Sequence, residues 1–124
     1  MVPQNRVQAL NMEHPDKIKQ IKYKLKNEPD LLTPSEAQNY ALTVAAYTSD
    51  LRDRCGVLEA KYADIKATLI QEGNNGITSK ALADGSEVGM EWAVIQQHIK
   101  GMDEIIKVLK KAIQHFENEG RNIY

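Results

Sequence analysis

The apolar residues between positions 88 and 116 recur at spacings that alternate between four and three residues, without a slip. They are Val88, Trp92, Ile95, Ile99, Met102, Ile106, Leu109, Ile113 and Phe116, here called the seam. A 3.5-residue repeat kept over about four heptads holds one apolar ridge against a partner helix as the two helices supercoil. A single amphipathic helix on a globular core does not need this regularity. The seam therefore predicts one long helix that packs against another helix.

Length and composition favour a single folded domain with a small core. The chain has 124 residues, of which 42% are hydrophobic and 27% charged, and only one Trp, one Phe and five Tyr. An all-helical chain of this size has few places to bury apolar side chains except against another copy of itself. The net charge of −1 gives no general attraction to nucleic acid or to anionic lipid, so any such attraction has to be local.

Cysteine usage and the first residues bear on location. Cys55 is the only cysteine, which excludes an intramolecular disulfide and fits a reducing compartment. The start of the sequence has no basic segment followed by an apolar run, and no stretch approaches the roughly 18 apolar residues of a membrane span. We therefore expect no signal peptide, no membrane partner and a cytoplasmic location.

Proline placement divides the chain into two parts. The four prolines lie at positions 3, 15, 29 and 34, so the remaining 90 residues lack the strongest helix breaker. This predicts a short basic N-terminal segment over 1–32 and a long helical hairpin over 33–124. Thr33 and Glu36 have the spacing of a capping box around Pro34, which predicts that a helix begins there and continues to Glu72.

The apolar pattern of this helix changes along its length. One row has seven-residue steps: Ala37, Val44, Leu51, Leu58 and Ile65. The accompanying row is Tyr40 and Tyr47 at first, and Cys55, Tyr62 and Leu69 later. The apolar stripe therefore drifts around the helix, as a 3.6-residue period predicts where no partner enforces a 3.5-residue one.

A break at residues 73–76, Gly-Asn-Asn-Gly, predicts a turn, because Gly and Asn tolerate the left-handed conformation that ends a helix. One or two helical turns are expected over 77–83, and 84–87 offers a second capping box. The seam helix should then continue to about Glu119, with Gly120 as its stop. Apolar residues beside the seam widen its apolar surface: Val94, Ile105, Val108 and Ala112. The predicted fold is therefore all-α, a short N-terminal helix followed by a long antiparallel helical hairpin that packs into a homo-oligomer.

The local charge anomaly of the chain is a lysine-rich segment at 17–26. It contains Lys17, Lys19, Lys22, Tyr23, Lys24 and Lys26, without an acidic residue. Lysines gain affinity for a phosphate backbone by counterion release, and a tyrosine can stack on an exposed base, so these residues are the predicted nucleic-acid-binding site. Two other interpretations are a solvated helix face above a buried stripe of Ile18, Ile21 and Leu25, and a contact with an anionic membrane surface. The alternation over 21–26 also allows an edge strand, although Pro15 and Asp16 favour a helix start.

Catalytic and metal-binding signatures are not found in the sequence. The three histidines lie far apart, and no zinc-protease, phosphate-loop or nucleophile-elbow motif occurs. His115 and Glu119 are one helical turn apart, but the Glu-x-x-His pattern of di-iron bundles is missing. Cys55 is typical of a small core residue. We therefore expect a non-enzymatic protein without a metal or a cofactor.

The arrangement resembles the UvsY family of phage recombination mediators over about residues 35–120. The likeness comprises a short basic front end, a long helix with tyrosines in its first half, a glycine turn, a Lys-x-x-x-Asp linker and a C-terminal helix with an early aromatic. The residues that carry it are Tyr40, Tyr47, Leu58, Glu59, Ala60, Gly73, Lys80, Asp84, Val88 and Trp92.

The resemblance implies a ring-like homo-oligomer that binds single-stranded DNA and helps a recombinase to replace a single-strand-binding protein there. In that family, basic side chains around the helical body contact DNA. The matching residues here, Arg52, Arg54, Lys61 and Lys66, are interleaved with acidic residues, which directs attention to Lys17–Lys26 instead. The seam from Trp92 to Phe116 is the predicted oligomer interface. The alternative is a small phage-type adaptor or inhibitor that binds a protein partner and no nucleic acid.

Overall fold

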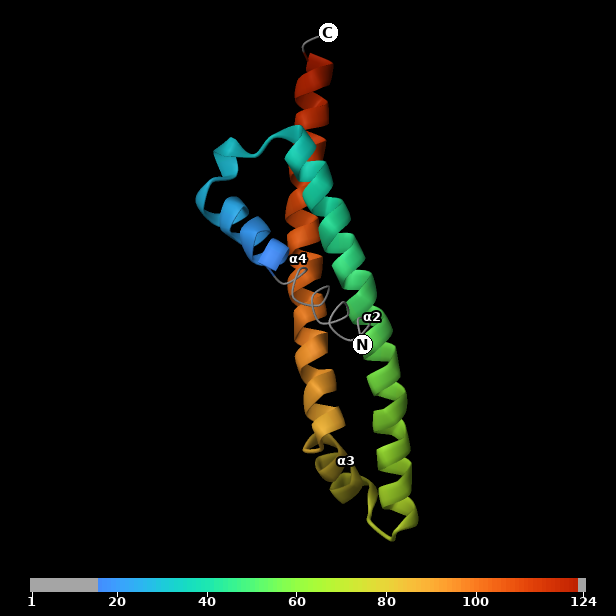
Figure 1. The fold of residues 1–124 in the computed structure, drawn as a ribbon. Coiled ribbons are helices and arrows are strands. Elements are labelled where there is room, and N and C mark those ends of the chain that lie inside the picture. Colours follow the sequence, from blue (N-terminus) through green and yellow to red (C-terminus); the bar gives the residue numbers. More distant parts are fainter. Residues whose placement is uncertain (1–15, 123–124) are drawn as a thin grey trace, which may run out of the picture. The chain divides into compact units, whose positions relative to one another are not determined.

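The computed structural model describes residues 16–122, and all the regular secondary structure in that stretch is helical. A helix over 16–27 is followed by the 3-10 turn η1 (Pro29–Leu31) and then by α2 (Pro34–Gln71), α3 (Gly76–Asp84) and α4 (Glu87–Asn122) (Figure 1). Between residues 16 and 122 there is no strand, which confirms the all-α prediction and excludes the edge strand. No helix in this part of the chain is long and apolar enough to cross a membrane.

The predicted start of α2 is confirmed by reciprocal capping. The Glu36 backbone N–H donates to Thr33 Oγ1 at 3.1 Å, and the Thr33 backbone N–H donates to Glu36 Oε1 at 3.1 Å. The start of α4 differs from the prediction, because Ser86 is the capping residue: its Oγ accepts from the Gly89 backbone N–H at 3.1 Å. Asp84 is instead the last residue of α3. Its carboxylate is therefore free to make tertiary bonds rather than to cap α4.

The helix ends depend on the backbone conformation of particular glycines. Gly73 follows α2 with a φ of +101°, a left-handed conformation that glycine adopts without a steric penalty, and α2 stops at Gln71, one residue before the predicted end at Glu72. Gly120 keeps a helical conformation, and α4 continues to Asn122. The predicted stop at Gly120 was therefore wrong, because a glycine ends a helix only where it leaves the right-handed region.

The described residues form two compact units. Unit 1 contains residues 16–47 and 102–122, and unit 2 is Thr48–Gly101. Each unit therefore includes one part of α2 and one part of α4, to which unit 1 adds the helix over 16–27 and η1, and unit 2 adds α3.

Unit 1 buries apolar side chains from three helices. Ile18 and Ile21, at 3% and 2% exposure, come from the helix over 16–27. The other buried apolar side chains within helices of this unit are Ala37, Val44, Met102 and Leu109. The helix over 16–27 thus buries the stripe that its sequence indicated, while its lysines lie on the remaining faces.

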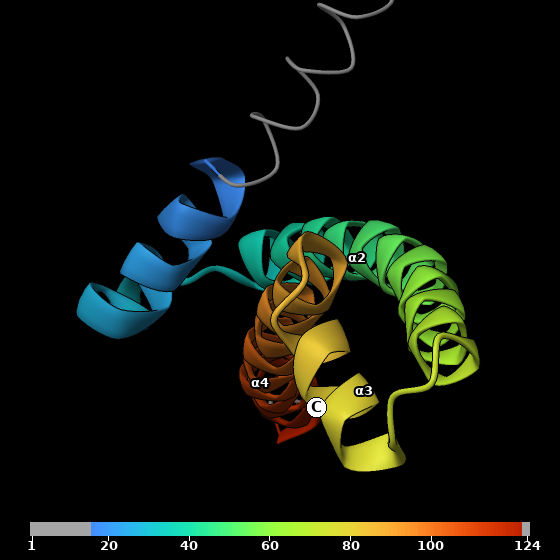
Figure 2. The same cartoon turned by 90° about the horizontal axis from the view of Figure 1, so that it is seen from below.

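Unit 2 has a smaller apolar core and a close approach of two helices. Leu58 of α2, Ala83 of α3 and Ile95 of α4 are buried. A Cβ at Gly89 would collide with the Ala83 carbonyl oxygen and would lie 2.8 Å from that of Asp84. Figure 2 shows α3 beside the start of α4, the packing that requires glycine at position 89.

The burial pattern of α4 follows the predicted seam. Every seam residue is buried or half-buried within the single chain, and Met102 and Leu109 are 3% and 0% exposed. On α2 the accompanying row also shifts as expected: Tyr40 is half-buried in unit 1, whereas in unit 2 Arg54, at the equivalent heptad position, is exposed and Cys55 is half-buried. The drift has a physical reason, since in unit 1 α2 also packs beside the helix over 16–27.

Candidate nucleic-acid interface

The helix over 16–27 turns three different faces to its surroundings. Ile18 and Ile21 are buried and Leu25 is half-buried, so this stripe is the packed face. Because successive residues of an α-helix are rotated by about 100°, Tyr23 lies on the opposite side, where it is 60% exposed. The lysines occupy the two flanks between these faces.

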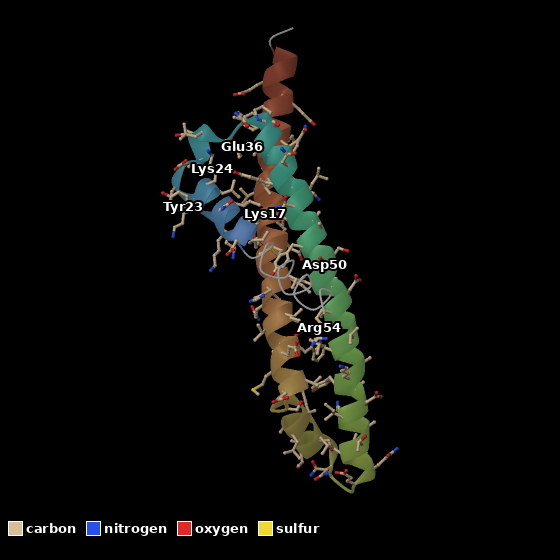
Figure 3. All side chains as sticks on the ribbon, in the orientation of Figure 1. Lys17, Tyr23, Lys24, Glu36, Asp50 and Arg54 are labelled. Atoms are coloured by element: carbon tan, nitrogen blue, oxygen red, sulfur yellow. The ribbon has the colours of Figure 1, made fainter. Side chains whose placement is uncertain are left out.

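Lys17 and Lys24 lie on the flank that faces α2. Lys17 borders a recess lined by Gln20, Ile21, Asn39, Tyr40 and Thr43. The Lys24 side chain is only 20% exposed, and its Nζ lies 3.7 Å from Glu28 Oε2 and 3.8 Å from Glu36 Oε2. Figure 3 shows Lys24 near Glu36 and Tyr23 on the outer side of the helix. The Lys24 ammonium group therefore already has two carboxylates as partners within the protein and is not a candidate phosphate contact.

Glu36 collects several donors at one carboxylate. Its pKa is lowered, first by the hydrogen bond from the Thr33 backbone N–H, and further by the Thr33 hydroxyl and the nearby Lys24 charge. Tyr40 Oη donates to Glu36 Oε2 at 3.3 Å, and partial burial followed by the negative charge of Glu36 raises the pKa of Tyr40. This carboxylate both caps α2 and faces the ammonium group of the lysine helix.

Lys19, Lys22 and Lys26 lie on the other flank, and all three are exposed. Between residues 16 and 122 none of the three forms an ion pair. Their spacing of three and four residues puts them on one side of the helix, next to Tyr23. These four residues, Lys19, Lys22, Tyr23 and Lys26, are called the basic surface below.

An open groove in unit 1 lies beside the basic surface. It has a volume of about 430 Å³ and is lined by Lys22, Leu25, Lys26, Glu104, Ile105 and Val108. Its floor is aliphatic, and Val108 is 50% exposed within it. Lys107 Nζ lies 3.4 Å from Glu104 Oε1, so the acidic residue of the lining already faces a cation. We call this feature the α4 groove.

Unit 2 contains a polar cluster of a different kind. Tyr62 Oη donates to Asp84 Oδ1 at 2.6 Å, and Lys80 Nζ donates to Asp84 Oδ2 at 2.7 Å. The pKa of Asp84 is lowered, first by the Lys80 hydrogen bond and then by that of Tyr62. The Tyr62 ring also packs on Trp92 with centroids 4.8 Å apart. Tyr62 of α2 therefore contacts both α3 and α4, while the Lys80–Asp84 bond lies within α3.

Arg54, one of the two arginines that the resemblance suggested as DNA contacts, has a partner in unit 2. Arg54 Nη2 lies 2.7 Å from Glu91 Oε1, and its Nε donates to the same oxygen at 3.1 Å. This bond links α2 to α4. Asp84 and Trp92, which carry part of the resemblance, likewise link helices of unit 2 through Tyr62, and Lys80 bonds to Asp84 within α3. The sequence did not indicate the pairs between helices, because partners such as residues 54 and 91 share no local pattern.

The remaining candidate side chains make local contacts. His115 Nε2 lies 2.9 Å from Glu119 Oε1, one turn along the same helix. Cys55 is half-buried. Across the part of the chain that the structure describes, no three His, Cys, Asp or Glu side chains come close enough together to hold a metal ion.

The predicted interface residues of the seam lie inside the units. Ile95, Met102 and Leu109 are buried, and the other members, Trp92, Ile99, Ile106, Ile113 and Phe116, are half-buried. A side chain that is already covered in one chain has little area left for a second copy. In an assembly that keeps this packing, the apolar side chains of α4 available to another copy are exposed ones such as Met90 and Val94, at 55% and 53% exposure.

Comparisons with protein families, curated proteins and solved structures found no match to this chain.

Proposed function

We propose that this protein is a non-enzymatic, oligomeric accessory protein of phage recombination or repair that binds single-stranded DNA through its basic surface. The observation that carries the proposal is the exposure of Lys19, Lys22 and Lys26 beside the exposed ring of Tyr23, on a helix whose opposite face is buried. Lysines in this arrangement contact successive phosphates, and the ring offers a stacking surface that accepts any base. A buried apolar face holds the helix in place, so its cations act from a defined position.

The recombination step is the part of the proposal that derives from the resemblance to the UvsY family. A mediator of that kind acts by holding single-stranded DNA while a recombinase is loaded, which requires binding but no bond-breaking chemistry. Several copies in one oligomer would multiply a weak three-lysine contact into a tight one, since linked sites raise the effective concentration of DNA.

A salt titration tests the binding step. Binding of a labelled single-stranded oligonucleotide would be measured by fluorescence anisotropy between about 50 and 200 mM salt, for the protein and for a Lys19→Gln, Lys22→Gln, Lys26→Gln variant. Each phosphate contact makes the slope of log K against log salt more negative by about 0.7 for single strands. The triple variant should therefore have a slope that is less steep by about 2 per bound chain.

The matched control removes three other exposed lysines, Lys100, Lys110 and Lys111, and should leave the slope nearly unchanged. Equal losses in the two triple variants would mean that binding depends on general charge, which contradicts a defined site. Tyr23→Ala should weaken binding by about 1–3 kcal/mol through lost stacking, and Tyr23→Phe should restore it.

Self-association is tested on the same samples by light scattering. We propose that copies meet through the exposed apolar face of α4 that includes Met90 and Val94. Glutamate at both positions should reduce the mass to that of one chain while the helical circular dichroism stays the same. An unchanged mass in the double variant would exclude this face as the interface.

The second candidate function is a protein-binding adaptor that has no nucleic-acid partner. The observation that favours it is the α4 groove, whose aliphatic floor is partly open to solvent. An intact, folded protein that shows no oligonucleotide binding at 50 mM salt would exclude the first function and leave this one.

A further inference from the structure

The α4 groove has the composition of a helix-binding surface. Leu25, Ile105 and Val108 form its floor, and Lys22 and Lys26 form one rim. An exposed aliphatic floor beside charged side chains is typical of grooves that receive the apolar face of an amphipathic helix.

We infer that the α4 groove binds an acidic amphipathic helix of a protein partner. The charge of that helix follows from the rim, because Lys22 and Lys26 have no ion pair among residues 16–122 and Glu104 is held by Lys107 at 3.4 Å. Carboxylates flanking an apolar stripe would meet both lysines while the stripe covers Val108, which is half exposed.

The secondary structure of the ligand follows from the walls of the groove. Both walls are α-helices, whose backbone N–H and C=O groups are bonded within the helix. An extended peptide would find no free sheet edge here and would gain no main-chain hydrogen bonds. A helix instead gains by packing its side-chain ridges between those of the two walls.

A nucleic-acid base fits the groove less well than a helix does. The apolar residues of the lining are aliphatic and none is aromatic, whereas base binding without sequence preference relies on aromatic stacking. Tyr23, the exposed aromatic of this helix, is outside the lining. The floor of the groove and the Tyr23 ring are therefore separate, although Lys22 and Lys26 belong to both the α4 groove and the basic surface.

The shared lysines have a consequence that rests on the proposed function. An acidic helix in the groove would occupy Lys22 and Lys26, two of the three cations of the basic surface. The protein partner and single-stranded DNA would then exclude each other. Docking of the helix itself depends only on the groove and would hold even if no DNA binds.

The probe is a fluorescein-labelled 18-residue peptide with leucines on one helical face and glutamate and alanine elsewhere. Its controls are a scrambled peptide of the same composition and a version with lysine in place of glutamate. Anisotropy at about 50 mM salt should show binding of the first peptide alone. Absence of binding up to 1 mM by the folded protein, or equal binding of the scrambled or lysine peptide, would overturn the inference.

Val108→Glu and Val57→Glu form a matched pair of variants. Both valines lie on helices and are similarly exposed, at 50% and 48%, but only Val108 lines the groove. We expect Val108→Glu to weaken peptide binding at least tenfold and Val57→Glu to change it less than twofold. Similar losses in both variants would overturn the inference.

Oligonucleotide binding and the mass from light scattering test two other possible occupants of the α4 groove, DNA and a second copy of the chain. Val108→Glu should leave oligonucleotide affinity within about threefold and the mass unchanged, while a Lys22→Gln, Lys26→Gln variant weakens both ligands at least tenfold. If Val108→Glu abolished oligonucleotide binding without affecting the peptide, the groove would be part of the DNA site. If it lowered the mass, a second copy would be the occupant. Either result would overturn the inference, whereas a basic surface that fails to bind DNA would leave peptide binding intact.

Discussion

Units 1 and 2 contain parts of the same two long helices, yet they are held together by different interactions. Unit 1 buries aliphatic side chains from three helices, with Ile21 and Leu109 almost fully covered. Unit 2 buries fewer apolar side chains and adds directed polar contacts, such as those of Asp84 with Tyr62 and Lys80. Aliphatic packing in unit 1 leaves Lys19, Lys22 and Lys26 available to ligands, whereas in unit 2 charged groups such as those of Arg54 and Glu91 link two helices.

The largest expected effects come from one leucine in each unit. Leu109 and Leu58 are 0% and 1% exposed, so truncating either to alanine should lower the free energy of unfolding by about 2–5 kcal/mol. Hydrogen exchange should distinguish them: Leu109→Ala should expose amides over 16–27, and Leu58→Ala amides of α3. The same exchange pattern in both variants would show that the two units open as one.

A glycine pair in α4 tests the close helix approach in unit 2. Gly89→Ala places a methyl group against the Ala83 carbonyl, and overpacking of this kind costs about 1–3 kcal/mol. Gly101→Ala meets nothing within 4 Å and should raise stability by up to about 1 kcal/mol through helix propensity. Urea unfolding would measure both, and a neutral Gly89→Ala would mean that α3 shifts freely.

The Asp84 cluster gives unit 2 a dependence on pH. Hydrogen bonds from Lys80 and Tyr62 hold the pKa of Asp84 below its usual 3.8, so the ionised carboxylate favours the folded state. This stabilisation is present above pH 3.8 and is lost as the pH falls through the lower folded pKa. Tyr62→Phe should therefore lower the melting temperature at pH 7, with a smaller difference near pH 3. Tyr23→Phe, whose ring is exposed, is the control and should have no effect at either pH.

The smallest effect is expected at Ser79 of α3. Its side chain is 0% exposed, and its Oγ has no hydrogen-bond partner among residues 16–122. An unpaired buried hydroxyl costs desolvation free energy on folding, and its removal eliminates this cost. Ser79→Ala should therefore leave the free energy of unfolding unchanged or slightly higher. A clear loss of stability in thermal unfolding would indicate that the hydroxyl has a partner in solution.

Local sequence signals predicted the elements of the fold but not their tertiary contacts. The Thr33–Glu36 spacing fixed the start of α2, and the left-handed preference of Gly73 marked its end. Asp84 was predicted to cap α4 because its spacing from Glu87 fits a capping box. Hydrogen bonds from Lys80 and Tyr62 compete with that role for the Asp84 carboxylate. No periodic pattern could show that competition, since Tyr62 is 22 residues away.

For the candidate site, as for the fold, the local features were predicted and the tertiary contacts were not. The lysine segment was recognised from its charge, and the buried stripe of Ile18 and Ile21 from its spacing. The pairing of Lys24 with Glu36 was not predicted, because it depends on how the chain turns through η1. The α4 groove was also missed, since it joins Leu25 to Val108 across more than 80 residues of sequence.

Glu36 performs two tasks with one side chain, and this has an evolutionary consequence. Its carboxylate accepts from Thr33 at the start of α2, and it also faces Lys24 of the helix that carries the basic surface. A substitution at position 36 would alter a helix terminus and a tertiary contact at the same time. Among diverging descendants of this chain, positions 24, 33, 36 and 40 should therefore covary as a group, whereas Lys19, Lys22 and Lys26 would be free to follow the ligand.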